Sequence, residues 1–182
     1  PVCLFIFQRK DTVLRIIDRI SRVKPKKIYL MSDQGRNEEE KKRVQECREA
    51  VEAAINWNCK VIKDYAAENR GVFENIGMGA MRVFSQEEVA IFLEDDNLPE
   101  ITFFSYCKQM LEKYKDNDRV VWICGTNYLG KYENSSGESY MFTQHLLPCG
   151  WASWRKKYTK YYDSFFDTFN ETIKERIKPL YR

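Results

Sequence analysis

The sequence predicts an α/β fold with a mostly parallel central sheet flanked by helices. Short apolar segments alternate with longer segments in which apolar residues recur at helical spacing. The clearest strand covers residues 89–94, where five apolar residues run directly into a group of acids. A strand without polar alternation is typical of a parallel sheet that is covered on both faces. Alternating strands and helices then imply right-handed crossover connections.

The first 65 residues contain three predicted strands and two predicted helices. The strands are the apolar segments at residues 2–7, 27–32 and, more weakly, 60–64. Asp11 is placed to cap the first helix, which Pro25 ends. Asn37 followed by Glu40 has the spacing of a capping box and predicts the start of the second helix.

The alternation continues to about residue 127 and then loosens. Further predicted elements are a helix at residues 73–85, the strand at 89–94, a helix carrying Phe103, Cys107, Met110 and Tyr114, and a buried strand at 120–124. A possible strand at residues 140–143 and an aromatic segment at 151–154 follow. No repeat or linker divides the chain, so residues 1–182 are expected to form a single domain.

Composition excludes several classes of protein. A net charge of +3 is too small, and its residues too scattered, to indicate a nucleic-acid partner. The nearest basic cluster, residues 155–160, is expected to be a solvated helix face. No apolar run approaches the roughly 20 residues of a transmembrane helix.

The six cysteines are dispersed without C-x-x-C spacing. This pattern argues against a zinc site or a disulfide framework and favours a reducing compartment. The expected localisation is therefore cytoplasmic, with any membrane association made through segments outside this chain.

Three consecutive acids, Glu94, Asp95 and Asp96, follow the strand at residues 89–93. Ligands of open α/β sheets bind beyond the carboxyl ends of the strands. Because adjacent carboxylates repel one another, a divalent metal carrying a phosphorylated ligand is the natural partner. The alternative is a solvated acidic turn that caps the next helix.

The loop after the first strand reads Gln-Arg-Lys-Asp and contains no glycine. Both the dinucleotide-binding fingerprint and the Walker loop need glycines there. A bound nucleoside diphosphate would therefore have to be neutralised by a metal and side chains. His145 is the single histidine, so a histidine-based metal site or a Ser-His-Asp triad is poorly supported, and a structural role is at least as plausible.

A receiver domain of a response regulator is the specific rival, because Asp95 is followed by Leu98 and Pro99. Receivers need an acidic pair after the first strand, where this chain has Gln8 and Arg9. They also need a lysine after the last strand, and residues 124–127 contain none. The receiver interpretation is rejected.

Four segments in order resemble the GT-A glycosyltransferases. Asp33 ends the second strand, Asn-Arg-Gly stands at residues 69–71, and residues 94–96 look like the D-x-D motif in the Glu-Asp-Asp form of the N-acetylglucosaminyltransferase I group. Residues 150–155, Gly-Trp-Ala-Ser-Trp-Arg, are similar to a segment of bacterial GT-A proteins, some of them sugar transferases or haemolysin-like proteins.

This resemblance implies a metal-dependent transferase that moves a sugar from a UDP-linked donor, with inversion, to a saccharide or another hydroxyl acceptor. Asp96 would ligate Mn²⁺ or Mg²⁺ bridging the donor phosphates, which stabilises the leaving group. Asp95 would lie near the ribose or the metal's waters, and Glu94 near the donor sugar. The resemblance covers roughly residues 1–165, and the family's later segments are missing, so the domain is expected to be truncated at its C-terminus.

The resemblance also implies where the nucleotide binds. The residues that would hold the base and ribose are Phe7, Gln8, Arg9 and Asp33. Those beside the nucleotide would be Asn69, Arg70 and Gly71. The alternatives are that Asp33 and Gly71 only shape turns and that the two arginines are solvated.

The acceptor side is less defined. An inverting enzyme needs a general base, and Asp163 is the first candidate and Asp167 the second. Trp151 and Trp154 would stack on sugar rings or else pack in the core. Two other functions stay open: a catalytically silent nucleotide- or sugar-binding module, and a nucleotidyltransferase, whose usual glycine-rich basic loop is absent here.

Overall fold

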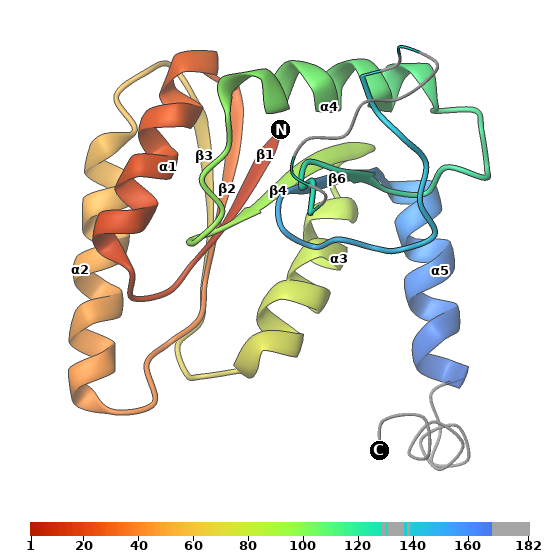
Figure 1. The fold of residues 1–182 in the computed structure, drawn as a ribbon. Coiled ribbons are helices and arrows are strands. Elements are labelled where there is room, and N and C mark those ends of the chain that lie inside the picture. The colour runs from red at the N-terminus through yellow and green to blue at the C-terminus, as the bar shows by residue number, and fades with distance from the viewer. Residues whose placement is uncertain (129, 131–136, 138, 169–182) are drawn as a thin grey trace.

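A single mixed sheet, in the order β3-β2-β1-β4-β6-β5, organises the structure (Figure 1). The computed structural model describes residues 1–128, 130, 137 and 139–168. Its strands are β1 (Val2–Ile6), β2 (Lys27–Ser32), β3 (Lys60–Tyr65), β4 (Val89–Glu94), β5 (Ile123–Cys124) and β6 (Trp151–Trp154). Strands β1 to β4 run parallel, and β6 lies antiparallel between β4 and β5.

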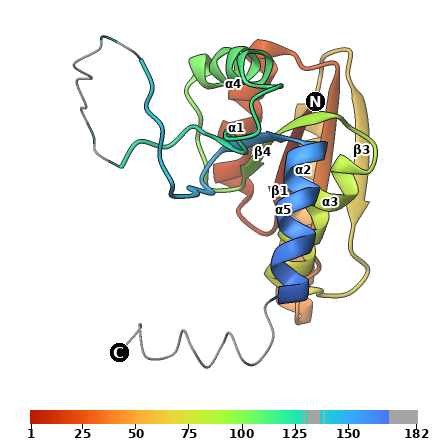
Figure 2. The ribbon, with the colours of Figure 1, turned by 90° about the vertical axis from the view of Figure 1, so that its right-hand side faces the viewer.

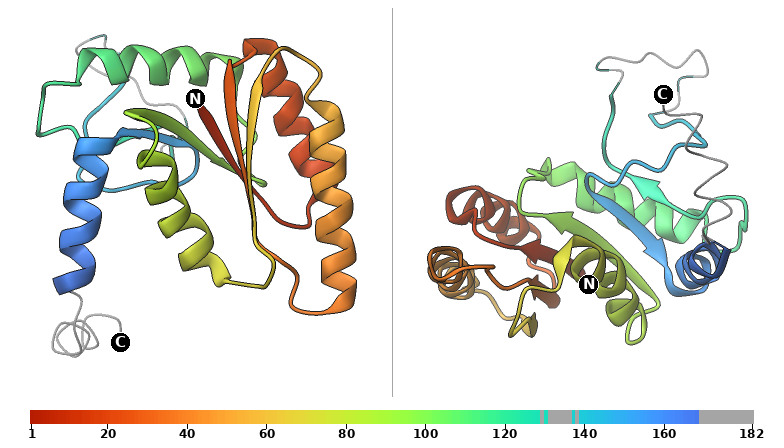
Figure 3. Two further views of the ribbon diagram at one scale, coloured as in Figure 1. Left: turned by 180° about the vertical axis from the view of Figure 1, so that it is seen from behind. Right: turned by 90° about the horizontal axis from the view of Figure 1, so that it is seen from below.

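Helices cover both faces of the sheet (Figure 3). They are α1 (Lys10–Val23), α2 (Glu38–Ala54), the π-helical turn η1 (Phe73–Gly77), α3 (Met78–Phe84), α4 (Ile101–Lys113) and α5 (Arg155–Thr168). Alternate residues of β1 point to the two faces, because side chains alternate along a strand. Leu4 joins the core under α1, α2 and α4, whereas Phe5 joins the core under α3 and α5. Burial on both faces explains why β1 reads as a continuous apolar run.

On the face of the sheet to which Phe5 points, α5 lies next to α3 (Figure 2). At Gly79 of α3, an added Cβ would lie 2.9 Å from the ring of Phe5, so this glycine allows the helix to pack closely on β1. None of the helices in the described part of the chain is long and apolar enough to cross a membrane. All six cysteines are free thiols.

The first two helices differ in how well their starts were predicted. The side chain of Asn37 accepts a hydrogen bond from the backbone N–H of Glu40 at 2.9 Å, as the capping pattern predicts. Asp11 does not cap α1, because the helix already begins at Lys10 with Arg9 as its N-cap. The connection from β1 is only residues 7–9, which leaves Asp11 inside the first turn.

The C-terminal part of the sheet was predicted least well. The expected strand at residues 120–124 is reduced to Ile123–Cys124, because only these residues pair with β6. Residues 140–143 form no strand. The aromatic segment at residues 151–154 is itself a fully buried strand, β6.

Trp151 is a core residue, and the expectation that it stacks on a sugar is wrong. Its ring lies 4.0 Å from that of Phe92 and 3.8 Å from that of Trp122, both stacked, and the residue is 3% exposed. Both ring faces are therefore covered. Trp154 is buried as well, and its indole N–H donates to the carbonyl of Leu111 at 3.1 Å.

The basic cluster at residues 155–160 is not simply a solvated face. Lys157 is 4% exposed, and its ammonium donates to the carbonyl oxygens of Tyr114, Asn117 and Val120 at 2.6–2.9 Å. The ammonium also lies 3.7 Å from the ring centre of Trp154. Burial lowers the pKa of Lys157. This lysine satisfies carbonyls at and after the end of α4 and so joins α4 to α5.

Candidate functional site

A pocket of about 270 Å³ opens at the carboxyl edge of the sheet, where β1 lies between β2 and β4. The chain leaves β1 toward β2 and returns to its other side as β4, so this is the point at which the strand order reverses, where α/β folds bind ligands. The lining residues are Phe5, Ile6, Phe7, Asp33, Arg36, Asn69, Gly71, Val72, Asn75, Ile76, Glu94 and Asp95. Six of the residues named from the sequence are among them: Phe7, Asp33, Asn69, Gly71, Glu94 and Asp95.

Asp33 holds the loop that forms one wall of this pocket. Its Oδ1 accepts the backbone N–H groups of Gln34 and Arg70 at 2.8 and 2.9 Å. Its Oδ2 accepts the backbone N–H of Gly71 at 2.9 Å and the amide of Asn69 at 3.1 Å. Asp33 is 7% exposed, and four donors already occupy its carboxylate. It therefore shapes the pocket through the loop at residues 69–71.

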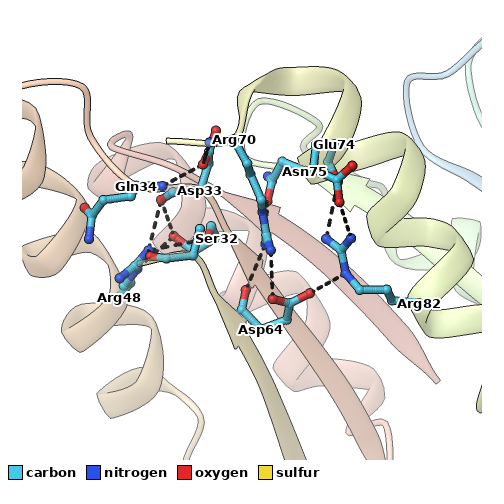
Figure 4. Close-up of polar contacts among 10 residues, drawn as sticks. Ser32, Asp33, Gln34, Arg48, Asp64, Arg70, Glu74, Asn75 and Arg82 are labelled. Carbon is cyan, nitrogen blue, oxygen red and sulfur yellow. Dashed lines mark hydrogen bonds and ion pairs between the residues drawn. The ribbon is translucent and has the colours of Figure 1, made fainter. Parts of the chain in front are cut away.

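Arg70 is not among the pocket residues, and its guanidinium points toward Asp64 and Asn75 (Figure 4). Its guanidinium donates to Asp64 Oδ1 at 3.0 Å and to Asn75 Oδ1 at 2.9 and 3.1 Å. Asp64 also accepts from Arg82 at 2.7 Å, and the two arginines lower its pKa against the opposing effect of burial. The alternative that Arg70 is solvated is therefore wrong, because 21% of its side chain is exposed and its guanidinium is held by Asp64 and Asn75.

Arg48 is a buried residue that the sequence analysis missed. Its guanidinium donates to Ser32 Oγ at 2.9 Å and to the carbonyls of Asp33 and Ala66 at 3.0 and 3.2 Å. It therefore joins the chain at the carboxyl ends of β2 and β3, and Figure 4 shows its contacts with Ser32 and Asp33. The available signal was its position on the apolar stripe of α2, between Cys47 and Val51.

Asp95 ties the end of β4 to the loop after β1. Its Oδ2 accepts the backbone N–H of Phe7 at 3.1 Å, and its Oδ1 accepts Arg9 at 2.8 Å. The residue is 7% exposed. Burial raises the pKa of Asp95, and Arg9 together with the Phe7 N–H opposes that rise.

Asp96 is more open, with 53% of its side chain exposed. Its Oδ2 accepts from the same Arg9 nitrogen at 2.8 Å, and its Oδ1 accepts the amide of Asn97 at 2.9 Å. One guanidinium therefore bridges two adjacent carboxylates.

Glu94 is the chemically available acid of the triplet. It is partly buried and lines the pocket, and among the described residues its carboxylate accepts no hydrogen bond. Burial raises the pKa of Glu94, and the charges of Asp96 and Asp95 raise it further, while Arg9 lowers it. A carboxyl group with a raised pKa holds its proton to higher pH than an exposed one and is a candidate for proton transfer.

Only part of the acid triplet is able to ligate a metal ion. The described residues contain no group of three His, Cys, Asp or Glu side chains placed to hold an ion. Asp95 is buried and both its oxygens are engaged, which excludes it as a ligand in this arrangement. Asp96 offers a half-exposed carboxylate, and Mg²⁺ sites commonly use one or two carboxylates together with substrate phosphates. The residues thus fit a metal that Asp96 would hold together with a diphosphate.

The remaining predicted residues are Gln8, His145 and two acids of α5. Gln8 is not among the pocket residues, and its side-chain oxygen accepts a hydrogen bond from Arg43 at 2.9 Å. Asp163 and Asp167 belong to α5, but their side chains lie outside what the structure describes. His145 is exposed and is not among the pocket residues.

Comparisons with known proteins identify the fold. The sequence matches no protein-family model, and no curated protein sequence matches it significantly. The structure is similar to 4-diphosphocytidyl-2C-methyl-D-erythritol synthase from Anaerococcus prevotii, with a TM-score of 0.56 and 11% identity over 93% of this chain and 77% of that one.

A second match is the mannosyltransferase PcManGT from Pyrobaculum calidifontis in complex with GDP-Man and Mn²⁺. Its TM-score is 0.47 and its identity 12%, over 67% of this chain and 33% of that chain. The chain thus spans about a third of the mannosyltransferase. The synthase match and the sheet order confirm the predicted fold class: an α/β fold of the nucleotide-diphospho-sugar transferase type.

Proposed function

We propose that this protein is a glycosyltransferase that binds a nucleotide-sugar donor, UDP-linked, in the pocket at the carboxyl edge of the sheet. It transfers the sugar with inversion to a hydroxyl group of a saccharide or another acceptor. The observation that carries this proposal is the placement of Glu94 and Asp96, an unbonded and a half-exposed carboxylate, at the point where the strand order reverses.

The pocket offers two kinds of surface to such a donor. Its inner wall is apolar, with Phe5, Phe7 and Ile76, and suits the flat base of a nucleotide. Its outer edge carries the acids and Arg9, where the charged diphosphate would lie. The loop held by Asp33 closes the side between them.

Asp96 would hold the divalent ion, Mn²⁺ or Mg²⁺, together with the donor's two phosphates. When bound, this ion supplies positive charge that stabilises the departing nucleoside diphosphate. Asp95 contributes by fixing the Phe7 backbone and Arg9 in place.

Two carboxylates are the proposed catalytic residues. Glu94 lines the pocket beside the other acids and would lie near the donor sugar, where a carboxyl group with a raised pKa could hold or accept a proton. Asp163 is proposed as the general base that takes the acceptor's proton, on the basis of its sequence position after the Gly-Trp segment.

Binding of UDP in the presence of Mn²⁺ tests the proposal. Calorimetry and thermal shift of the wild type should show binding, because a ligand of the native state raises the apparent stability. Asp96→Asn should weaken Mn²⁺-dependent UDP binding by about tenfold or more, which corresponds to the loss of one charge-assisted ligand of about 1.4 kcal/mol. Asp118→Asn, an exposed acid after α4, is the matched control and should bind as the wild type does. The proposal fails if UDP and UDP-sugars bind neither with nor without Mn²⁺.

A catalytically silent nucleotide-binding module is the second candidate. The observation that favours it is the ion pair of Arg9 with both Asp95 and Asp96, which occupies the acids. Release of UDP from UDP-sugars separates the two. A protein that binds UDP with Mn²⁺ yet releases none from any UDP-sugar, with or without saccharide acceptors, is the silent module.

A further inference from the structure

We propose that Arg9 is a built-in cation that occupies the metal position at Asp96 in the free protein and leaves Asp96 when a nucleoside diphosphate binds. The inference rests on the proposed function for its ligand. It adds an exchange: the divalent ion and the guanidinium use the same carboxylate in turn. Metal binding and nucleotide binding are then coupled through one side chain.

The contacts of Arg9 define the position. A single guanidinium nitrogen lies 2.8 Å from Asp95 Oδ1 and 2.8 Å from Asp96 Oδ2. These partners stand 86 and 87 residues away in the sequence, so the fold, and not local geometry, brings them together. An ion held by Asp96 would have to share the space that the guanidinium occupies beside Oδ2.

Electrostatics explains why a cation is needed there. Two adjacent carboxylates repel each other, and Asp95 is almost fully buried. The guanidinium offsets both charges. A divalent ion ligated by Asp96 would lie close to this positive group, and like charges at such a distance repel strongly. The two cations are therefore expected to exclude each other.

The side chain of Arg9 is exposed enough to move away from Asp96. Arg9 is the N-cap residue of α1, and 56% of its side chain is exposed. Its neighbour Phe7 lines the pocket, so rotation of the side chain can bring the guanidinium to a ligand at the pocket mouth. Phosphate oxygens accept two parallel hydrogen bonds from a guanidinium. A diphosphate thus provides a new partner for Arg9 and frees Asp96 for the metal.

The alternative is a purely structural role, in which Arg9 forms a permanent ion pair that joins the loop after β1 to the end of β4. Asp95 already makes that connection through the Phe7 backbone N–H at 3.1 Å. A permanent ion pair would keep Arg9 on Asp96 with or without a diphosphate, so UDP would tighten Mn²⁺ binding by Arg9→Gln at least as much as binding by the wild type. The factor by which UDP tightens Mn²⁺ binding, compared between the wild type and Arg9→Gln, is therefore the deciding measurement.

The experiment titrates the protein with Mn²⁺ alone and follows free Mn²⁺ by electron paramagnetic resonance. Arg9→Gln should bind Mn²⁺ at least tenfold more tightly than the wild type. Lys10→Gln removes the same charge from the neighbouring exposed residue and should stay within about twofold of the wild type. The double variant Arg9→Gln with Asp96→Asn should lose the gain, which locates the ion at Asp96.

A second arm repeats the titration with UDP present. By linkage, UDP should tighten Mn²⁺ binding by the wild type, and Mn²⁺ should tighten UDP binding by the same factor. Arg9→Gln should show a smaller factor, because its Asp96 is free from the start. Circular dichroism confirms that each variant is folded, and Arg9→Met replaces Arg9→Gln if the latter folds poorly.

The inference is overturned if the folded neutral variant binds Mn²⁺ no more tightly than Lys10→Gln. This result is distinct from failure of the proposed function, since the first arm uses no nucleotide. If UDP does not bind but Arg9→Gln still gains Mn²⁺ affinity, Arg9 and the metal compete for Asp96, whereas release of Asp96 by a nucleotide and the nucleotide-sugar proposal both fall.

Discussion

Two groups of acids stand at the same edge of the sheet and differ in what surrounds them. Asp33 follows β2 and accepts four hydrogen bonds, three of them from backbone N–H groups. The acid triplet, Glu94 to Asp96, lies at the end of β4. Asp95 and Asp96 share one exposed arginine, Arg9, and among the described residues the Glu94 carboxylate accepts no hydrogen bond. Only the triplet keeps oxygens available for chemistry.

Because Asp33 and the acid triplet differ in this way, an acid after a buried strand is not by itself evidence of a ligand site. The number of donors already bound decides its role, because a saturated carboxylate stabilises the backbone that surrounds it. At Asp33 the loop at residues 69–71 supplies those donors. At Glu94 no loop does, and a charge left without a partner is more often functional.

Asp33→Ala should have the largest effect on stability. It leaves three backbone N–H groups and the Asn69 amide without their acceptor. We expect a loss of about 3 kcal/mol in the free energy of unfolding, in line with hydrogen bonds to charged groups, measured by urea denaturation. The comparison variant Asp96→Ala should lose less than about 0.5 kcal/mol, as at an exposed site. Equal losses for the two variants would refute the distinction between the two groups.

Gly71→Ala perturbs the loop at residues 69–71 less than Asp33→Ala does. Gly71 has a φ of +79°, and an added Cβ would meet no atom within 4 Å, so only backbone strain opposes the substitution. We expect a destabilisation of about 1 kcal/mol, the cost of a left-handed conformation for an L-residue. Thermal unfolding should show a fall of about 2–4 °C. A loss as large as that of Asp33→Ala would mean that the loop depends on its conformation more than on the carboxylate.

Glu94→Gln should have the smallest effect, and its sign should depend on pH. A carboxyl group whose pKa is raised in the folded state favours folding while it is protonated, and this stability is lost as pH rises through the raised pKa. Wild type and variant should therefore be equally stable at about pH 4, near the unfolded value for Glu. At pH 8 the variant should be more stable by about 0.5 kcal/mol, the size of an ordinary surface change. A variant that is less stable at pH 8 would show that Glu94 has a partner that favours its charged form.

The sequence predicted those elements whose signal is local. Strands β1, β2 and β4 are buried on both faces and so appear as uninterrupted apolar runs, and Asn37 caps α2 through a residue three positions away. Strand β6 was missed because four residues, two of them tryptophan, carry no alternation, and their pairing with β4 lies about 60 residues back along the chain.

In the candidate site, too, only features with a local sequence signal were predicted. Pocket residues such as Phe7 and Glu94 were found because they follow strands. The partners of Arg9 and Arg70, and the burial of Trp151 and Lys157, depend on contacts between separate elements. Neither charge nor residue type reveals such contacts, so the roles of these four residues required the structure.

The position of β6 between β4 and β5 sets an order for assembly during synthesis. Strand β5 pairs only with β6, and β6 is the outer partner of β4. On the ribosome, the four parallel strands can associate once residue 94 has emerged. The open edge of β4 must then wait for residues 151–154, and an unpaired strand edge is a site for association with other chains. The interval in which residues 95–150 are made is therefore when the nascent chain is most exposed to aggregation and to chaperones.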